Sequence, residues 1–178
     1  DFVERTYIHN NYTGYTGDRA FVRDDDAQKA FSKLRSSQAG MYAWRLSPSC
    51  PPEYREKTPA LQAALVRETD FAFKQSFAFC PYSPEAVYRY INFLLPQGRF
   101  DDAILVAQTC LKLDPYNTSI SELVKNLQDY KQQNEERTKA VGQVDQMENT
   151  VRTNPGDSRN LVMLGFAYAQ MQQTNRAV

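Results

Sequence analysis

The spacing of apolar residues predicts a first helix from Asp26 to about Leu46. The apolar positions of this segment lie three, four or seven residues apart, so a helix places them on one face: Ala27, Ala30, Phe31, Leu34, Met41 and Trp44. Asp24, Asp25 and Asp26 stand at the start of the segment, where carboxylates cap the first turn and complement the helix dipole. We expect such apolar faces, with most of the chain's aromatic residues, to pack in a core.

A long loop and a second helix follow. Residues 47–58 contain Pro48, Pro51 and Pro52, which deny the backbone donors that a helix needs. Thr58 is suited to cap the next helix and Pro59 to occupy its first turn. This helix is expected to end near Cys80 and to carry one inward stripe: Leu61, Leu65, Ala72, Phe73, Ser76 and Phe77. Residues 1–25, in contrast, show no helical period and predict an extended or looped lead-in.

Residues 84–117 contain the clearest pattern, PEAVYRYINFLLPQGRFDDAILVAQTCLKLDPYN. It predicts two helices whose inward residues are Val87, Tyr90, Ile91 and Leu94, then Ala103, Ala107, Cys110 and Leu111. Gly98 suits the tight turn between them, Phe100 the groove between the helices, and Asp101 the cap of the second helix. Ala103 suits a close crossing of the two helices, and Pro115 ends the unit.

Prolines that could end similar units recur on both sides of this unit. Pro81 lies 34 residues before Pro115, and Pro155 lies 40 residues after it, a repeat with a six-residue insertion. Apolar positions between Pro115 and Pro155 predict two helices, the first polar and unusually long: Leu123, Leu127, Tyr130, Val141, Val144, Met147 and Val151. The last stretch restores the pattern at Leu161, Leu164, Gly165, Tyr168 and Ala177.

This order of Gly, aromatic, Ala and Pro positions resembles the tetratricopeptide (TPR) repeat family. Residues 84–117 and 158–178 resemble TPR units by their motif residues. Residues 26–83 and 118–157 are assigned as further units from the spacing of their helical patterns and of the prolines that end each unit. The resemblance implies an all-α fold in which helical hairpins stack into a right-handed superhelical solenoid over residues 26–178. A lone hairpin is unable to bury its own apolar face, so stacked neighbours are expected.

A second resemblance is carried by KAFSKLRSSQAGMYAWRLSP and DFAFKQSFAFCPYSPEAVYRY. These segments resemble the soluble C-terminal region of bacterial multi-pass membrane proteins related to protein O-mannosyltransferases. The resemblance implies an extracytoplasmic (periplasmic) location and a larger parent protein; without it, a cytoplasmic location is expected. None of that family's catalytic motifs occurs here, so no catalytic residue carries over. The start at Asp1, without Met, and the end at Val178 inside a predicted helix suggest a piece of a longer protein.

Charge and hydropathy narrow the range of partners. Twenty-one basic residues balance twenty-one acidic ones, so the positive footprint of a nucleic-acid-binding domain is missing. No stretch of the sequence approaches the 18 consecutive apolar residues of a membrane-spanning helix, so direct membrane insertion is not expected. Protein or peptide partners remain, among them the membrane-embedded part of a parent protein.

Residues suited to catalysis, metals or cofactors show no usable grouping in the sequence. His9 is the single histidine, which leaves Cys/His and Ser/His/Asp arrangements without support. Gly14 and Gly17 lack the following Lys-Ser/Thr of a phosphate loop, and the acidic run at residues 24–26 lacks calcium-loop spacing. The three cysteines lack zinc spacing, and a Cys50–Cys80 bridge and three buried thiols remain alternatives. We predict no enzyme, no cofactor and no metal site.

The TPR resemblance places a binding surface on the concave groove formed by the first helices of successive units. The residues expected to face it are Glu85, Tyr88, Arg89, Asn92 and Leu95 in the clearest unit, and Arg159, Val162, Met163 and Phe166 in the last. Arg89 and Asn92 are suited to bind a peptide carboxylate or backbone; the alternative is a solvated face that packs against a neighbouring segment.

Two functional hypotheses follow. The first is a non-catalytic interaction scaffold that binds a peptide, a partner protein or the rest of its own parent chain. The alternative is an extracytoplasmic accessory domain of a membrane-bound glycosyltransferase-like protein, which contributes to substrate or partner recognition.

Overall fold

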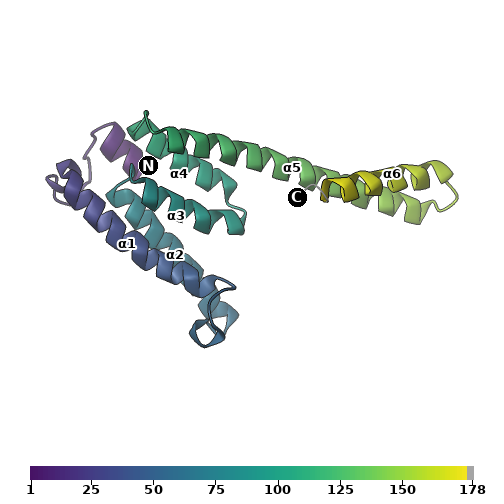
Figure 1. Ribbon diagram of the computed structural model, residues 1–178, viewed down its shortest axis with the longest axis horizontal. Helices are drawn as coiled ribbons and strands as arrows, with labels where there is room; N and C mark the ends of the chain where they lie inside the picture. The colour runs from purple at the N-terminus through teal and green to yellow at the C-terminus, as the bar shows by residue number, and fades with distance from the viewer. Residues whose placement is uncertain (176–178) are drawn as a thin grey trace. The chain divides into compact units, whose positions relative to one another are not determined.

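The computed structural model describes residues 1–175, the side chains of residues 1–169 among them. Each regular element in this range is a helix (Figure 1). The predicted all-α fold is therefore confirmed, whereas the superhelical solenoid stays a prediction. The chain forms two compact units, residues 1–128 and 129–178.

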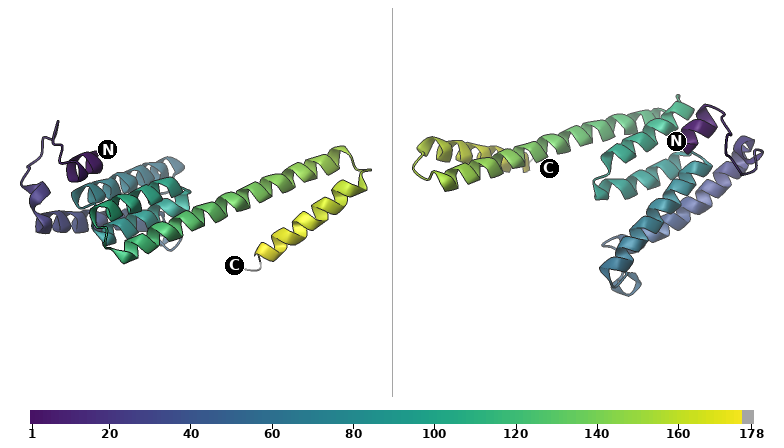
Figure 2. Two further views of the ribbon diagram at one scale, coloured as in Figure 1. Left: turned by 90° about the horizontal axis from the view of Figure 1, so that it is seen from above. Right: turned by 180° about the vertical axis from the view of Figure 1, so that it is seen from behind.

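Two helical hairpins make up most of the first unit. α1 (Asp25–Leu46) packs against α2 (Pro59–Phe79), and α3 (Pro84–Leu94) packs against α4 (Phe100–Leu113). Contacts between α1 and α3 and between α2 and α3 join the two hairpins. The first helices of the two hairpins, α1 and α3, therefore lie on the same face of the unit (Figures 1 and 2).

Local sequence signals set the starts of the first two helices. The Asp24 carboxylate accepts a hydrogen bond from the backbone N–H of Ala27 at 3.0 Å, which confirms the predicted cap of α1. Thr58 accepts from the backbone N–H of Leu61 at 3.3 Å, and Pro59 occupies the first turn of α2. A short 3-10 turn, η3 (Pro52–Tyr54), lies in the proline-rich loop between them.

Gly98 makes the turn between α3 and α4, as predicted. A 3-10 turn, η4 (Leu95–Gln97), leads to Gly98, whose φ of 70° is a left-handed conformation that glycine adopts without strain. The predicted cap at Asp101 is wrong, because α4 already begins at Phe100 and Asp101 lies inside its first turn. In that position the carboxylate still complements the helix dipole.

The core of the first unit forms around α3. The predicted inward residues of α3 and α4 are buried, with Leu111 partly so: Val87, Tyr90, Ile91, Leu94, Ala103, Ala107, Cys110 and Leu111. Phe73 of α2 stacks on Tyr90 with the ring centroids 5.5 Å apart. Ile120 and Leu127, from the start of α5 (Thr118–Thr153), complete the cluster. Burial of each large aliphatic side chain contributes about 1.5–3 kcal/mol, which explains why the pattern predicted these helices well.

The inward face predicted for α1 is wrong. α1 buries small or polar side chains instead: Gln28, Ser32, Ser36 and Ala39. The predicted apolar residues lie on the other side of the helix and are exposed, Phe31 by 54%, Leu34 by 71%, Met41 by 68% and Trp44 by 44%. Small side chains allow α1 and α2 to approach closely and to share hydroxyl hydrogen bonds, which large side chains would prevent.

α2 buries most of its predicted stripe. Leu65, Ala72, Phe73 and Ser76 are buried and Phe77 is partly buried. Leu61 is the exception and is exposed. It lies in the first turn of α2, which adjoins the proline-rich loop: the next residue, Gln62, donates from Nε2 to the carbonyl oxygen of Glu56 at 3.1 Å.

The N-terminal lead-in is partly helical, which corrects the prediction of an extended or looped segment. It contains a π-helical turn, η1 (Glu4–Ile8), and a 3-10 turn, η2 (Phe21–Arg23). The Tyr7 hydroxyl donates to the carbonyl oxygens of Ala78 and Phe79 at the end of α2, both at 3.0 Å. η1 also contacts α4 (Figure 2). Tertiary contacts therefore order a segment whose sequence has no helical period.

One continuous helix, α5, takes the place of the two helices predicted between Pro115 and Pro155. Asn117 caps it by accepting from the backbone N–H of Ile120 at 3.1 Å. No proline interrupts α5, and its single glycine, Gly142, costs a helix only about 1 kcal/mol. The apolar positions correctly predicted that the segment is helical. It forms one helix and not two because no residue within α5 terminates a helix.

The second unit is a hairpin formed by the C-terminal part of α5 and by α6 (Ser158–Asn175). Val144 is buried, and the Tyr168 hydroxyl bonds to the Glu148 carboxylate. Leu164 is half-buried, but Leu161, which the pattern predicted to face inward, is exposed because a pair of helices covers only one side of each. The prediction for Ala177 lies outside the described residues.

The three cysteines are free and buried, so of the two alternatives the structure contains three thiols and no Cys50–Cys80 bridge. Burial raises the pKa of the Cys80 thiol and raises that of Cys110 to about 12. Both thiols are therefore protonated at neutral pH, and the reactive thiolate form is scarce.

Candidate functional site

An open groove lies between α1 and α3. A cavity of about 470 Å³ is lined by Ser37, Gly40, Met41, Ala43 and Trp44 of α1, by Arg89, Asn92 and Phe93 of α3, and by Phe73 of α2. A second cavity of about 320 Å³ shares Ala43, Asn92 and Phe93 with the first. It continues the hollow toward Pro48 and Pro96. We call the two cavities together the α1–α3 groove.

Arg89 bridges the groove from α3 to α1. Its Nη2 pairs with Glu85 Oε1 one turn earlier at 2.8 Å, and its Nη1 donates to Ser37 Oγ at 3.4 Å. The guanidinium passes close to the backbone of α1, because a Cβ atom at Gly40 would lie 3.5 Å from Arg89 Nη1, at ordinary van der Waals distance. The guanidinium is held at the groove while its side chain stays accessible to solvent.

The walls of the groove are mainly apolar. Met41 and Trp44 expose their side chains on the α1 side, and Trp44 is supported by Tyr54, with the ring centroids 6.0 Å apart. Asn92 is exposed on the α3 side. Its amide offers two donors and one acceptor, the set that pairs with a peptide backbone. The groove therefore combines apolar surface with a few polar groups that fix orientation, as binding sites commonly do.

The structure gathers only part of the predicted contact set at this groove. Glu85, Arg89 and Asn92 lie in it or at its edge. Tyr88 turns toward α5, and its hydroxyl donates to the carbonyl oxygen of Ser119 at 3.3 Å. Leu95 is partly buried against the core and does not line either cavity.

The remaining predicted contacts belong to the second unit. They are exposed on α6: Arg159, Val162, Met163 and Phe166.

The α1 wall of the groove was missed by the sequence prediction, which assigned Met41 and Trp44 to the core. A signal was present in the sequence. Ser32, Ser36 and Ala39 recur at helical spacing on the other face of α1, and small residues at such spacing favour close packing of two helices.

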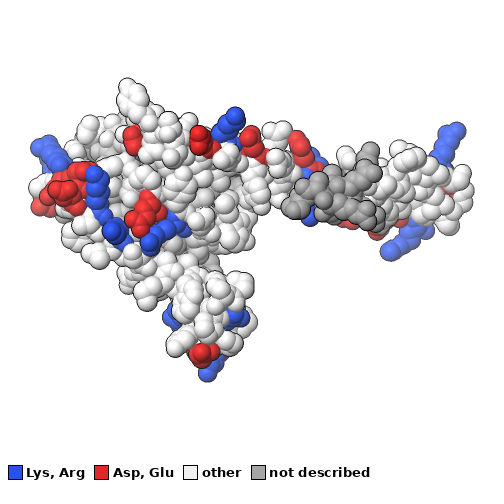
Figure 3. Space-filling view, in the orientation of Figure 1, with Lys and Arg blue, Asp and Glu red and all other residues white. Residues whose placement is uncertain are grey.

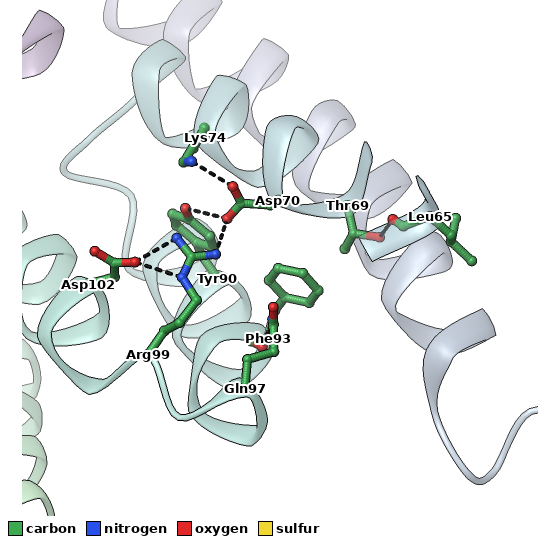
Figure 4. A network of polar contacts seen from close by, with 9 residues as sticks. All are labelled: Leu65, Thr69, Asp70, Lys74, Tyr90, Phe93, Gln97, Arg99 and Asp102. Carbon is green, nitrogen blue, oxygen red and sulfur yellow. Dashed lines mark hydrogen bonds and ion pairs between the residues drawn. The ribbon is translucent and has the colours of Figure 1, made fainter. Parts of the chain in front are cut away.

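A polar network holds α3 in place beside the groove (Figure 4). Asp70 of α2 accepts from Tyr90 Oη at 3.0 Å and pairs with Arg99 Nη1 at 2.7 Å and with Lys74 Nζ at 2.6 Å. Arg99 also pairs with Asp102 of α4 at 2.6 Å. The network thus ties α2 to both helices of the second hairpin.

The ionised state of this network is the stable one. Burial by itself raises the pKa of Asp70, but hydrogen bonds from Lys74, Arg99 and Tyr90 outweigh it and hold that pKa below its usual value. Burial likewise lowers the pKa of Arg99, and its bonds to Asp70 and Asp102 raise it above the ordinary value. Because these groups satisfy one another, we assign the network a structural role.

Among the described residues, no cluster of three or more His, Cys, Asp or Glu side chains is placed to hold a metal ion. In the same part of the chain, no helix has the length and apolar character needed to cross a membrane. His9 is exposed in the lead-in.

Comparison with known proteins does not assign the chain to a family. No protein-family model, curated protein or solved structure matches it.

Proposed function

We propose that this protein is a non-catalytic interaction scaffold whose α1–α3 groove binds a segment of another protein or of a larger parent chain. The observation that carries the proposal is the groove itself, which has exposed apolar side chains on one wall and Arg89 and Asn92 on the other. Arg89 and Asn92 orient a bound backbone or carboxylate, and Met41 and Trp44 supply apolar contact area. The resemblance to TPR repeats supports the same face, since α1 and α3 are the first helices of their hairpins.

The alternative role, an extracytoplasmic accessory domain of a membrane-bound glycosyltransferase-like protein, makes use of the same groove. In that case the bound segment belongs to the parent protein. Both roles therefore predict a groove that accepts a polypeptide, and the test below applies to either.

The test is selection of binding peptides from a random display library on the immobilised protein. The selected peptides are then measured against Asn92→Trp, which fills the groove from an exposed position on α3. Ala63→Trp is the matched control, because Ala63 is exposed on α2 and lines neither groove cavity. We expect Asn92→Trp to weaken binding by about ten-fold or more, a change of about 1.4 kcal/mol, and Ala63→Trp to leave it unchanged. Equal binding by both variants would reject the groove as the site.

A further inference from the structure

The outer wall of the groove continues along α1 as an exposed apolar stripe. Phe31, Leu34, Met41 and Trp44, which we call the α1 stripe, follow helical spacing and are all at least 44% exposed. From the first to the last of these residues the helix rises by about 20 Å. The stripe therefore runs obliquely along α1: Met41 and Trp44 line the hollow, and Phe31 and Leu34 lie beyond it. At the N-terminal end of the stripe, the Phe31 ring also contacts Phe21 of η2 and Phe79 of α2, with ring centroids 5.7 and 5.9 Å apart.

Basic side chains flank the α1 stripe. Between Gln28 and Leu46 the helix carries Lys29, Lys33, Arg35 and Arg45 and no Asp or Glu. Lys29 pairs with Asp25 and Arg45 pairs with Glu56. On the face that Figure 3 displays, carboxylates lie near the N-terminal end of α1, and a mixed group of acidic and basic side chains lies over the region of α1 and α3.

Among the residues that the structure describes, two of these cations have no carboxylate partner. Lys33 and Arg35 precede and follow Leu34, so they project to either side of the stripe. Within the described part of the chain neither forms an ion pair, and Arg35 instead donates to the side-chain oxygens of Gln38 and Gln75. An apolar stripe with a cation available on each side complements a surface that is apolar in the middle and acidic at its edges.

We propose that the partner segment of the proposed function is an amphipathic α-helix with acidic flanks, which lies along the α1 stripe. The inference rests on the proposed groove function and narrows its ligand. A helix presents an apolar face of matching 3.6-residue period and pairs with another helix along its whole length. Its Asp or Glu side chains reach Lys33 on one side and Arg35 on the other.

Two other occupants fit less well. A second copy of α1 would bring the same cations into opposition, which costs free energy. A flat lipid surface would contact the stripe but would not fill the hollow that Gly40 and Phe93 line. Both occupants are outcomes of the experiment below.

The experiment uses three synthetic fluorescent peptides of about 20 residues, long enough to cover the stripe as helices. The first places Leu at the apolar positions of successive heptads and Glu on both flanks. The second replaces each Glu by Lys, and the third shuffles the first so that no helical period remains. We expect the acidic periodic peptide to bind at least about ten-fold more tightly than either of the others at about 0.1 M salt, by fluorescence anisotropy. The difference from the basic peptide shrinks at about 1 M salt because the charges are screened.

Matched variants locate the binding. Leu34→Gln with Met41→Gln removes the middle of the stripe, and we expect the acidic peptide to lose at least about ten-fold in affinity. Phe71→Gln with Leu105→Gln is the control, since these exposed apolar residues lie on α2 and α4, and affinity is expected to stay unchanged. Lys33→Glu with Arg35→Glu is expected to weaken the acidic peptide and to favour the basic one.

Several results would overturn the inference. Equal binding of the basic or shuffled peptide would remove the acidic helix as the ligand. Retained binding by the Leu34→Gln, Met41→Gln variant would remove the stripe. Stripe-dependent binding of the protein to phosphatidylserine vesicles would make the partner a membrane, and a stripe-dependent dimer by light scattering would make it a second copy.

The failure of this inference is distinguishable from failure of the proposed function. If display-selected peptides depend on Asn92 but are insensitive to Leu34→Gln alone, at a position outside the groove lining, the groove binds polypeptides of another kind. If those peptides are also insensitive to Asn92→Trp, both proposals fall.

Discussion

Ser76 of α2 donates a hydrogen bond to the backbone carbonyl oxygen of Ser32 of α1 at 3.0 Å, and both side chains are fully buried. Their hydroxyl oxygens lie 3.3 Å apart. This contact requires small side chains on the facing surfaces of the two helices. It fixes which side of α1 points inward, and it leaves Met41 and Trp44 on the groove side and exposed to solvent.

The orientation of α1 predicts unequal effects for the same substitution at two of its serines, Ser32 and Ser37. Ser32→Leu should destabilise the protein by about 1–3 kcal/mol, because a large side chain overpacks the α1–α2 contact. Ser37→Leu should change stability by less than about 0.5 kcal/mol, because Ser37 is exposed on the groove side. Urea denaturation of both variants measures the difference. A larger loss at Ser37 would mean that α1 is rotated relative to this description.

A pair of leucines tests the same orientation through burial. Leu94→Ala should cost about 2–5 kcal/mol, because Leu94 is 0% exposed in the core. Leu34→Ala should cost less than about 0.5 kcal/mol, because Leu34 is 71% exposed. Thermal and chemical unfolding of the two variants give the comparison, and equal losses would contradict it.

The Asp70 network predicts a dependence of stability on pH. The pKa of Asp70 is lowered in the folded protein, so its ionised form stabilises the fold above its unfolded pKa of about 3.9. This stabilisation is lost as the pH falls below that value and through the folded-state pKa. Asp70→Asn should therefore cost about 1–3 kcal/mol at pH 7 and progressively less below about pH 4.

The measurement is the free energy of unfolding of wild type and Asp70→Asn from neutral to acidic pH. Ser121→Ala, at an exposed position in the first turns of α5, serves as a control with no titrating group. A difference between wild type and Asp70→Asn that stays constant with pH would show that the carboxylate charge is not what the network uses.

The continuity of α5 predicts where proline is tolerated. Arg137→Pro should cost about 3 kcal/mol or split the helix, because it removes a backbone donor and clashes with the preceding turn. Thr118→Pro should be nearly neutral, because the first helical position accepts proline. Far-UV circular dichroism and amide hydrogen exchange over residues 131–141 report the break. Normal helicity in Arg137→Pro would instead favour the two helices that the sequence pattern predicted.

The sequence by itself determined the helices whose apolar stripe and local signals agree. Gly98 could be placed at its turn because only glycine adopts that conformation without strain. The residues buried in α3 could be named because large aliphatic and aromatic side chains at helical spacing gain more from burial than any competing arrangement offers. Arg89 and Asn92 could be placed on the groove side as the complement of that buried stripe.

Tertiary structure alone decided the rest. In α1 the hydrophobic pattern predicted that one face is buried, but the opposite face, with Ser32, Ser36 and Ala39, packs against α2. These small side chains allow the two helices to approach closely, and that effect depends on the shape of α2. η1 is ordered by contacts with α2 and α4 that lie far away in the sequence. The groove has an apolar α1 wall because Met41 and Trp44 point away from the surface that α1 packs on α2. Periodicity within one helix carries no information about which neighbour each face will meet.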